Sequence, residues 1–197
     1  MDLIDHIQKH VIEKLQKGLS EKLTYHNVAH TLDVLKQAVV IAKKEGITDA
    51  EDLLLLKVSV LYHDTGFLCS YHEHEESSCV VAKEELPAFG FTSSQVERVC
   101  GMIRATKVPQ DPKNHLEQII CDADLDYLGR ADFFEIGNNL YKEFMEQGIV
   151  TNFREWNMLQ IRFLEKHRYF TESSIKRRQK VKADYLQAIR ETEGLLS

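Results

Sequence analysis

The stretch of apolar residues over 50–64 constrains this chain more than any other feature. It reads AEDLLLLKVSVLYHD, and apart from its first turn only Lys57 and Ser59 interrupt the apolar residues before the final HD pair. A helix that is apolar on nearly every side must lie inside the fold, because no polar face is left to meet water. The stretch ends in the adjacent residues His63 and Asp64, and Thr65 and Gly66 follow. The sequence therefore places an imidazole and a carboxylate at the end of its most buried helix.

The remainder of the chain repeats the spacing of amphipathic helices. With 9 Gly and 3 Pro in 197 residues and few alternating β-branched runs, it contains no convincing strand. Leu3, Ile7, Val11 and Leu15 predict a first helix that ends at Lys17 and Gly18. Further helices are predicted over 28–45, 50–64, 73–86, 93–106, 115–127, 131–147, 152–168 and 172–195. We therefore expect an all-α bundle of about eight or nine helices.

Charge and cysteine content limit the classes of partner. The chain has 25 Lys and Arg against 31 Asp and Glu, and a net charge of −6 argues against a nucleic-acid-binding surface. The first residues lack the features of a secretory signal, and the apolar stretches are far shorter than the roughly 20 residues of a membrane span. The 4 Cys include no CxxC pair, as is typical of reduced thiols. We expect a cytoplasmic protein with neither a nucleic-acid nor a membrane partner.

Histidines and acids are concentrated on three segments. They are His26 and His30 in YHNVAHTLDV, His63 and Asp64 in LYHDTG, and Asp122 and Asp124 in CDADLDYLG. His26 and His30 are four residues apart and share a helix face if that helix begins by residue 26 or 27. The spacing alone is weak, because His6 and His10 share it on the first helix, where we expect a partly exposed pair.

The carboxylate of Asp64 indicates what these segments could bind. A carboxylate at the end of an apolar helix needs a compensating cation or hydrogen-bond donors, and a metal ion would satisfy Asp64. Imidazoles and carboxylates together suit divalent cations and leave coordination positions free for water and substrate oxygens. The residues therefore favour a metal site that can support hydrolysis.

The ordered set of His30, His63-Asp64 and Asp124 resembles the HD superfamily of metal-dependent phosphohydrolases, and the resemblance covers most of the chain. It implies an all-α fold of the HD-domain type in which these four residues bind the metal. We expect a single domain over 1–197, with a metal-binding core at about 24–130 and the helices of 131–197 packed on it. Asp64 is also expected to act in catalysis.

The segment YHNVAHTLDV is similar to the YHNxxHAxDV signature of cyclic-nucleotide phosphodiesterases within this superfamily. By that similarity His30 is a ligand and His26 is a candidate general acid, although His26 could instead be a cap or a supporting donor. Asp33 is a candidate to orient a ligand imidazole, or else a solvated acid. Asp122 and Asp126 lie two residues from Asp124 and would point elsewhere on a helix.

Additional candidates surround these ligands. The segment MIRAT at 102–106 lacks the paired histidines of superfamily members with two metals, so we expect one divalent ion, which could be Mn, Fe, Co, Ni, Zn or Mg. His74 either lines the pocket or begins a surface helix. Arg104, Lys107 and Arg130 are candidate phosphate clamps or solvated bases. The basic run KRRQKVK at 176–182 is expected on a solvated helix face.

Three functions remain open at this point. We favour a phosphohydrolase that uses metal-activated water to cleave a small phosphate ester, with a nucleotide as the first choice and monoester or diester undecided. One alternative is a metal-containing module that senses a nucleotide or phosphate without turnover. The other is a helical interaction protein whose histidines only satisfy core polar groups. The apolar stripes at 131–147 and 152–168 leave room for a homodimer.

Overall fold

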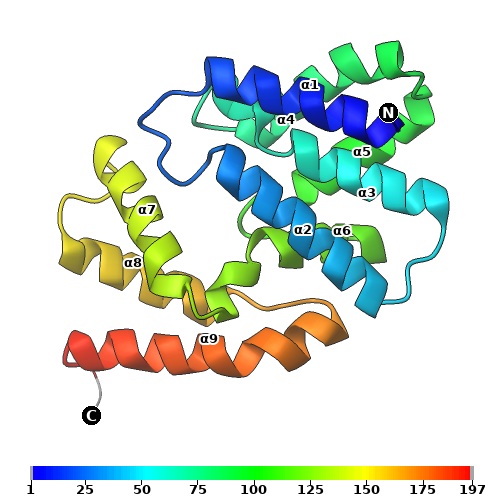
Figure 1. Ribbon diagram of the computed structural model, residues 1–197. Helices are drawn as coiled ribbons and strands as arrows, with labels where there is room; N and C mark the ends of the chain where they lie inside the picture. Colours follow the sequence, from blue (N-terminus) through cyan, green and yellow to red (C-terminus); the bar gives the residue numbers. More distant parts are fainter. Residues whose placement is uncertain (1, 196–197) are drawn as a thin grey trace.

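The computed structural model describes residues 2–195, and every regular element among them is helical (Figure 1). The α-helices are α1 (Leu3–Gly18), α2 (Val28–Lys44), α3 (Ala50–Tyr62), α4 (His74–Glu85), α5 (Ser93–Ala105), α6 (His115–Asp124), α7 (Phe133–Glu146), α8 (Phe153–Lys166) and α9 (Glu172–Thr192). Three short 3₁₀ helices are η1 (Thr65–Leu68), η2 (Leu86–Phe89) and η3 (Asp126–Gly129). The predicted all-α fold is confirmed, and none of the described helices is both long and apolar enough to cross a membrane.

Helix ends differ from the prediction where chemistry-bearing residues lie. The predicted helix 50–64 ends at Tyr62, so that His63 is the C-cap and Asp64 leads into η1. The predicted helix 115–127 ends at Asp124, and η3 follows. α2 begins at Val28, one residue after the N-cap Asn27, whose side chain accepts hydrogen bonds from the backbone N–H groups of the first turn. His26 therefore precedes the helix and does not share a helix face with His30.

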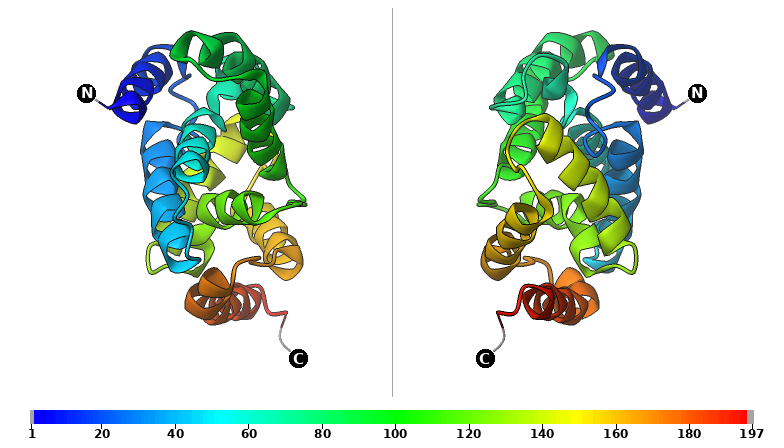
Figure 2. Two further views of the ribbon diagram at one scale, coloured as in Figure 1. Left: turned by 90° about the vertical axis from the view of Figure 1, so that its right-hand side faces the viewer. Right: turned by 90° about the vertical axis from the view of Figure 1, so that its left-hand side faces the viewer.

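Two hydrophobic clusters divide the molecule. The first is built by α1 to α6, and α3 is central to it, because its residues from Leu55 to Tyr62 are buried except Lys57. The second gathers Tyr25, η3, α7, α8 and the C-terminal part of α9. Figures 1 and 2 show α7 and α8 on one side of the α2–α6 layer, and α9 running along the end opposite α1. The division of the chain into a core and packed C-terminal helices stays a prediction.

Buried ion pairs attach α9 to the rest of the fold. The fully buried Asp126 of η3 accepts hydrogen bonds from Arg177 and Arg178. Lys182, 3 % exposed, donates to the backbone carbonyl of His167 at the end of α8. The prediction that the whole run 176–182 is solvated is therefore wrong. Arg178 and Lys182, four residues apart, face the protein because their partners, Asp126 and the carbonyl of His167, lie on other segments.

The turn after α3 depends on a residue without a side chain. The Gly66 backbone N–H donates to Ser78 Oγ of α4 at 2.8 Å, and the same hydroxyl donates to the carbonyl of His63 at 2.6 Å. A Cβ placed on Gly66 would lie 1.9 Å from the carbonyl oxygen of His74. The chain therefore crosses α4 in direct backbone contact, which fixes the direction in which His63 and Asp64 leave α3.

We predict that Gly66→Ala lowers the free energy of unfolding by about 3 kcal/mol or more, because the clash is with backbone that cannot shift easily. Gly137→Ala in α7 is the matched control, since its Cβ would meet Gln160 at an ordinary 3.6 Å and alanine favours a helix. Urea unfolding monitored by circular dichroism measures both variants. Equal stability of Gly66→Ala and the wild type would show that the backbone contact is not tight.

Candidate metal centre

Three helix ends converge at the boundary of the two clusters. His30 lies in the first turn of α2, His63 caps the end of α3, and Asp124 is the last residue of α6. One ligand atom from each of these three residues lies within 4.8 Å of the others. Helix ends suit this purpose because side chains there project beyond the packed helix walls. The structure thus brings together three residues that are distant in the sequence.

Asp64 joins the trio through one carboxylate oxygen. Its Oδ2 lies 3.4 Å from Nε2 of His30 and 3.2 Å from Nε2 of His63. Nε2 of His30 also lies 3.1 Å from Oδ1 of Asp124. The side chains of His30, His63 and Asp64 are at most 8 % exposed, and that of Asp124 is 15 % exposed. All four predicted ligands therefore form one nearly buried cluster.

The hydrogen bonds of His63 indicate what the cluster can bind. Its Nδ1 donates to the carbonyl of Val60 at 2.7 Å, so a neutral ring directs a lone pair from Nε2 toward Asp64. Both Nε2 of His63 and Oδ2 of Asp64 are buried without a hydrogen-bond partner. Two lone pairs that face each other at 3.2 Å need a positive charge between or beside them, which either a metal ion or a proton on the imidazole supplies. The donor set and its geometry fit a divalent metal ion.

Protonation is the other way in which the cluster can gain positive charge. Burial lowers the pKa of His63, but the carboxylates of Asp64 and Asp124 outweigh burial and hold it well above its usual value. Burial raises the pKa of Asp64, but the imidazoles of His63, His26 and His30 outweigh it and hold the carboxyl below its usual range. A metal ion bound here would therefore replace protons on the imidazoles.

Neighbouring acids on the same segment contrast with this cluster. Asp122 accepts hydrogen bonds from the backbone N–H groups of Phe170 and Thr171 and from the Thr171 hydroxyl. Asp126 is paired with Arg177 and Arg178, as described above. Alternate residues of DADLD thus point in different directions, in agreement with the choice of Asp124. The chain supplies donors for its structural acids, whereas Asp64 and Asp124 meet only imidazoles among the described residues.

A fully buried acid, Glu143 of α7, holds His26 and was missed by the sequence analysis. Its Oε1 contacts Nδ1 of His26 at 2.5 Å and accepts from the hydroxyl of Tyr71 at 3.1 Å. Its Oε2 accepts from the backbone N–H groups of Tyr25 and His26 at 2.9 and 3.0 Å. Burial lowers the pKa of His26, but the hydrogen bond that its ring donates to Glu143 and the charges of Asp64, Glu143 and Asp124 raise the pKa above its usual value.

The sequence does contain a signal for this residue. Glu143 follows Leu140 by three residues and Ile136 by seven, so it lies on the apolar stripe of its helix rather than on the polar face. An acid on an apolar stripe needs a buried partner. What the sequence does not give is the identity of that partner, which lies 117 residues earlier in the chain.

The remaining candidates are divided between the cavity and the surface. Nε2 of His74 lies 3.6 Å from Oδ1 of Asp64, so His74 lines the site, and Lys107 also lines the cavity. Arg104 is instead paired with Glu76 on the surface. The side chains of Arg130 and Asp33 bind each other at 2.7 Å, and neither residue lines the cavity. Arg104, Arg130 and Asp33 thus bind other side chains, and the roles expected of them at the site stay predictions.

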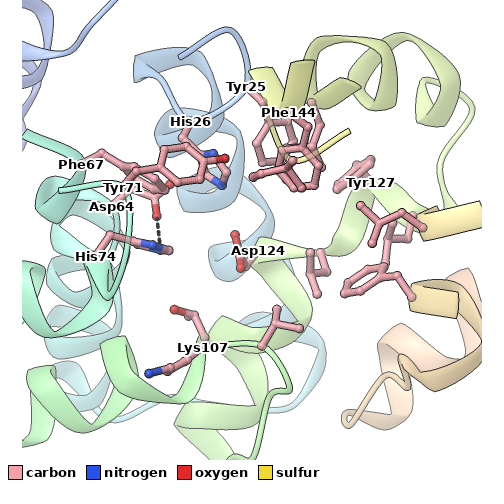
Figure 3. Close-up of a pocket in the computed structure, with 18 of the residues that line it drawn as sticks. Tyr25, His26, Asp64, Phe67, Tyr71, His74, Lys107, Asp124, Tyr127 and Phe144 are labelled. Atoms are coloured by element: carbon pink, nitrogen blue, oxygen red, sulfur yellow. Dashed lines mark ion pairs between the residues drawn. The ribbon is translucent and has the colours of Figure 1, made fainter. Parts of the chain in front are cut away.

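A cavity of about 470 Å³ opens beside the cluster (Figure 3). At the metal end, the ring of Phe67 stacks between His26 and His74, with ring centroids 4.3 and 4.0 Å apart. Figure 3 shows Asp64 and His74 on one side, Tyr127 and Phe144 on the other, and Asp124 between them. The cavity therefore leads from the cluster toward α7 and α8. Its volume is typical of a small-molecule site.

Comparisons with known proteins agree with this geometry. No curated protein matches the chain. Solved structures with the same fold include a predicted HD superfamily hydrolase from an uncultured Thermotogales bacterium (19 % identity, TM-score 0.62, 98 % of each chain covered). Others are the Lin1889 protein of Listeria innocua (17 %, 0.63, 100 % of each chain) and Bacillus subtilis YpgQ in complex with ADP (17 %, 0.66, 99 % of this chain and 97 % of that one).

A protein-family model gives the assignment directly. Residues 27–126, about half of the chain, match the model described as the HD domain. The matched range begins at the N-cap of α2 and ends in η3, so it contains His30, His63, Asp64 and Asp124. This chain belongs to the HD domain family.

Proposed function

We propose that the protein is a metal-dependent phosphohydrolase that cleaves a small phosphate ester. The observation that carries the proposal is the buried, unpartnered pair of His63 Nε2 and Asp64 Oδ2, which needs a cation and opens onto a cavity of substrate size. His30, His63, Asp64 and Asp124 would hold one divalent ion. When bound, such an ion supplies activated water and neutralises charge on a phosphoryl oxygen.

His26 is proposed as the group that donates a proton to the leaving oxygen. It lines the cavity, and its Nδ1 is engaged by Glu143, so that its other ring nitrogen is free for a substrate. Glu143 acts through His26 by holding its tautomer and stabilising the protonated ring. Asp64 is proposed to bind the metal through Oδ2, while its Oδ1 faces Nε2 of His74 at the cavity wall.

A nucleotide is the proposed substrate class. The support is the ADP in the structure of YpgQ, which shares the fold, together with the aromatic side chains of the cavity, which can stack on a base. Monoester and diester substrates both remain compatible with the cluster. The absence of a nucleic-acid partner, cytoplasmic location and a homodimer stay predictions.

Metal dependence tests the proposed function itself. Protein stripped with a chelator and reloaded with Mn, Co, Ni, Zn or Mg is expected to regain hydrolysis of a panel of nucleotide monoesters and diesters. Product formation is followed by phosphate release and chromatography. Inactivity with every metal would contradict the proposal, and a metal-dependent rise in Tm with nucleotide but no product would instead favour a sensing module.

Metal binding itself is predicted to depend on the HD pair. His63→Ala should weaken divalent-ion binding by ~100-fold or more, because a ligand is lost from a buried site. His10→Ala is the control, since His10 lies on α1, binds Glu85 of α4 and has a side chain that is 42 % exposed. Equilibrium dialysis followed by elemental analysis measures both. Unchanged metal content in His63→Ala would refute the assignment of this ligand.

The pH profile tests Glu143. A general acid works while protonated, so activity is lost as pH rises through the pKa of His26, which Glu143 helps to hold above its usual value of about 6.5. Glu143→Gln should lower kcat by about 10- to 100-fold and move this high-pH limb to lower pH. Glu146→Gln on the exposed side of the same helix is the control. If kcat falls but the pH at which activity is lost does not change, Glu143 supports only the structure and does not set the pKa of His26.

A further inference from the structure

The cavity has two chemically different ends. The metal end presents Asp64, Asp124, His26 and His74. The other end lies between α7 and α8 and is called the apolar arm here. It is lined by Tyr127, Leu128, Phe133, Leu140, Phe144, Trp156, Leu159, Gln160, Phe163 and Leu164. In Figure 3 Tyr127 and Phe144 mark this arm on the side away from His74. A substrate with its phosphoryl group at the metal would therefore extend its organic part into the arm.

The arm offers few groups that could hydrogen-bond a polar ligand. Gln160 is its one amide among the described lining residues, and its Nε2 lies 3.4 Å from Oδ1 of Asn157. Tyr127, in the wall of the arm, is 6 % exposed, whereas Ile149, which also lines the cavity, is 44 % exposed. Placing hydroxyl-rich or charged groups here would remove them from water without partners. An apolar or aromatic body suits the arm instead.

Positive charge is equally scarce along the cavity. Lys107 is the one lysine or arginine among the described lining residues, and its Nζ is paired with Glu73 at 2.5 Å. The same lining carries the acids Asp64, Glu73, Glu75 and Asp124. One divalent ion can neutralise a single phosphoryl group, but a chain of phosphates would bring additional negative charge next to these acids. Among the described lining residues, the cavity therefore offers no unpaired lysine or arginine to the additional phosphates of a polyphosphate.

From these two observations we infer that the substrate has a single phosphoryl group and an apolar or aromatic body that fills the apolar arm. The inference rests on the proposed function and narrows it. Among nucleotides it favours a single phosphate with the base in the arm over a diphosphate or triphosphate. Small polyol phosphates are disfavoured because they leave the arm empty and bury hydroxyl groups.

Binding to the metal-loaded protein tests the substrate class without requiring turnover. Dissociation constants for benzyl phosphate, glycerol 3-phosphate, AMP and ATP are measured by thermal shift and calorimetry, with metal in excess over nucleotide. Benzyl phosphate should bind at least tenfold more tightly than glycerol 3-phosphate, and AMP at least tenfold more tightly than ATP. Equal or reversed order in either pair would overturn the inference.

Charge placed in the arm gives a second test. Leu159→Glu should weaken the binding of benzyl phosphate at least tenfold while metal content stays unchanged, because Leu159 lines the arm from α8, whereas the ligands lie at the ends of α2, α3 and α6. Arg162→Gln, which also changes the charge by −1 but at an exposed position of α8, should bind benzyl phosphate within twofold of the wild type. Leu159→Lys should shift the ratio of ATP to AMP affinity toward ATP. An unchanged ratio in a folded, metal-loaded Leu159→Lys protein would overturn the inference.

The two levels of the proposal fail differently. If benzyl phosphate and AMP bind as expected but no product forms with any metal, the inferred ligand class is supported and the proposed hydrolysis is contradicted. If esters are hydrolysed but ATP or glycerol 3-phosphate binds best, hydrolysis stands and the inference about the arm fails.

Discussion

Two buried carboxylates that receive imidazoles but no lysine or arginine from the described residues are the constraint on which this structure depends. Asp64 and Asp124 lie at the meeting point of α2, α3 and α6 with only imidazoles as partners among the described residues. A short distance along the same segment, Asp126 is given two arginines by α9. Since the fold can bring arginine to a buried acid, leaving Asp64 and Asp124 without one keeps a place for an external cation.

The two hydrophobic clusters have different parts in the site. The first cluster fixes the ends of α2, α3 and α6, and the close crossing at Gly66 sets the direction of the chain beyond His63. The second cluster supplies α7, whose Glu143 reaches back to His26, and the apolar arm. The proposed metal ligands and the proposed proton donor His26 are thus held by different hydrophobic clusters. Destabilising α7 would affect His26 and the arm before it affected the metal ligands.

The sequence predicts best what is local. The apolar stretch of α3 identified the central helix, because helical spacing is contained in a short segment. The convergence of His30, His63 and Asp124, which lie on three separate segments, was expected only from the resemblance to the HD superfamily. The sequence did not reveal the partners of Arg104, Arg130 or the run 176–182, because a basic side chain has the same local pattern whether it faces water, an acid or a substrate. Glu143 was missed since its partner is set by tertiary packing alone.

The way His26 is held bears on the choice between hydrolysis and sensing. A module that only senses phosphate gains affinity from donors and cations around the anion, yet the cavity lining has Lys107 alone, already paired with Glu73. The chain instead buries Glu143 completely in order to orient one imidazole at the cavity wall. Burying a carboxylate to orient and charge an imidazole adds little to anion binding, but it is the arrangement that proton transfer to a leaving group requires. The scarcity of lysine and arginine in the described cavity lining and the contact between Glu143 and His26 together favour turnover over sensing.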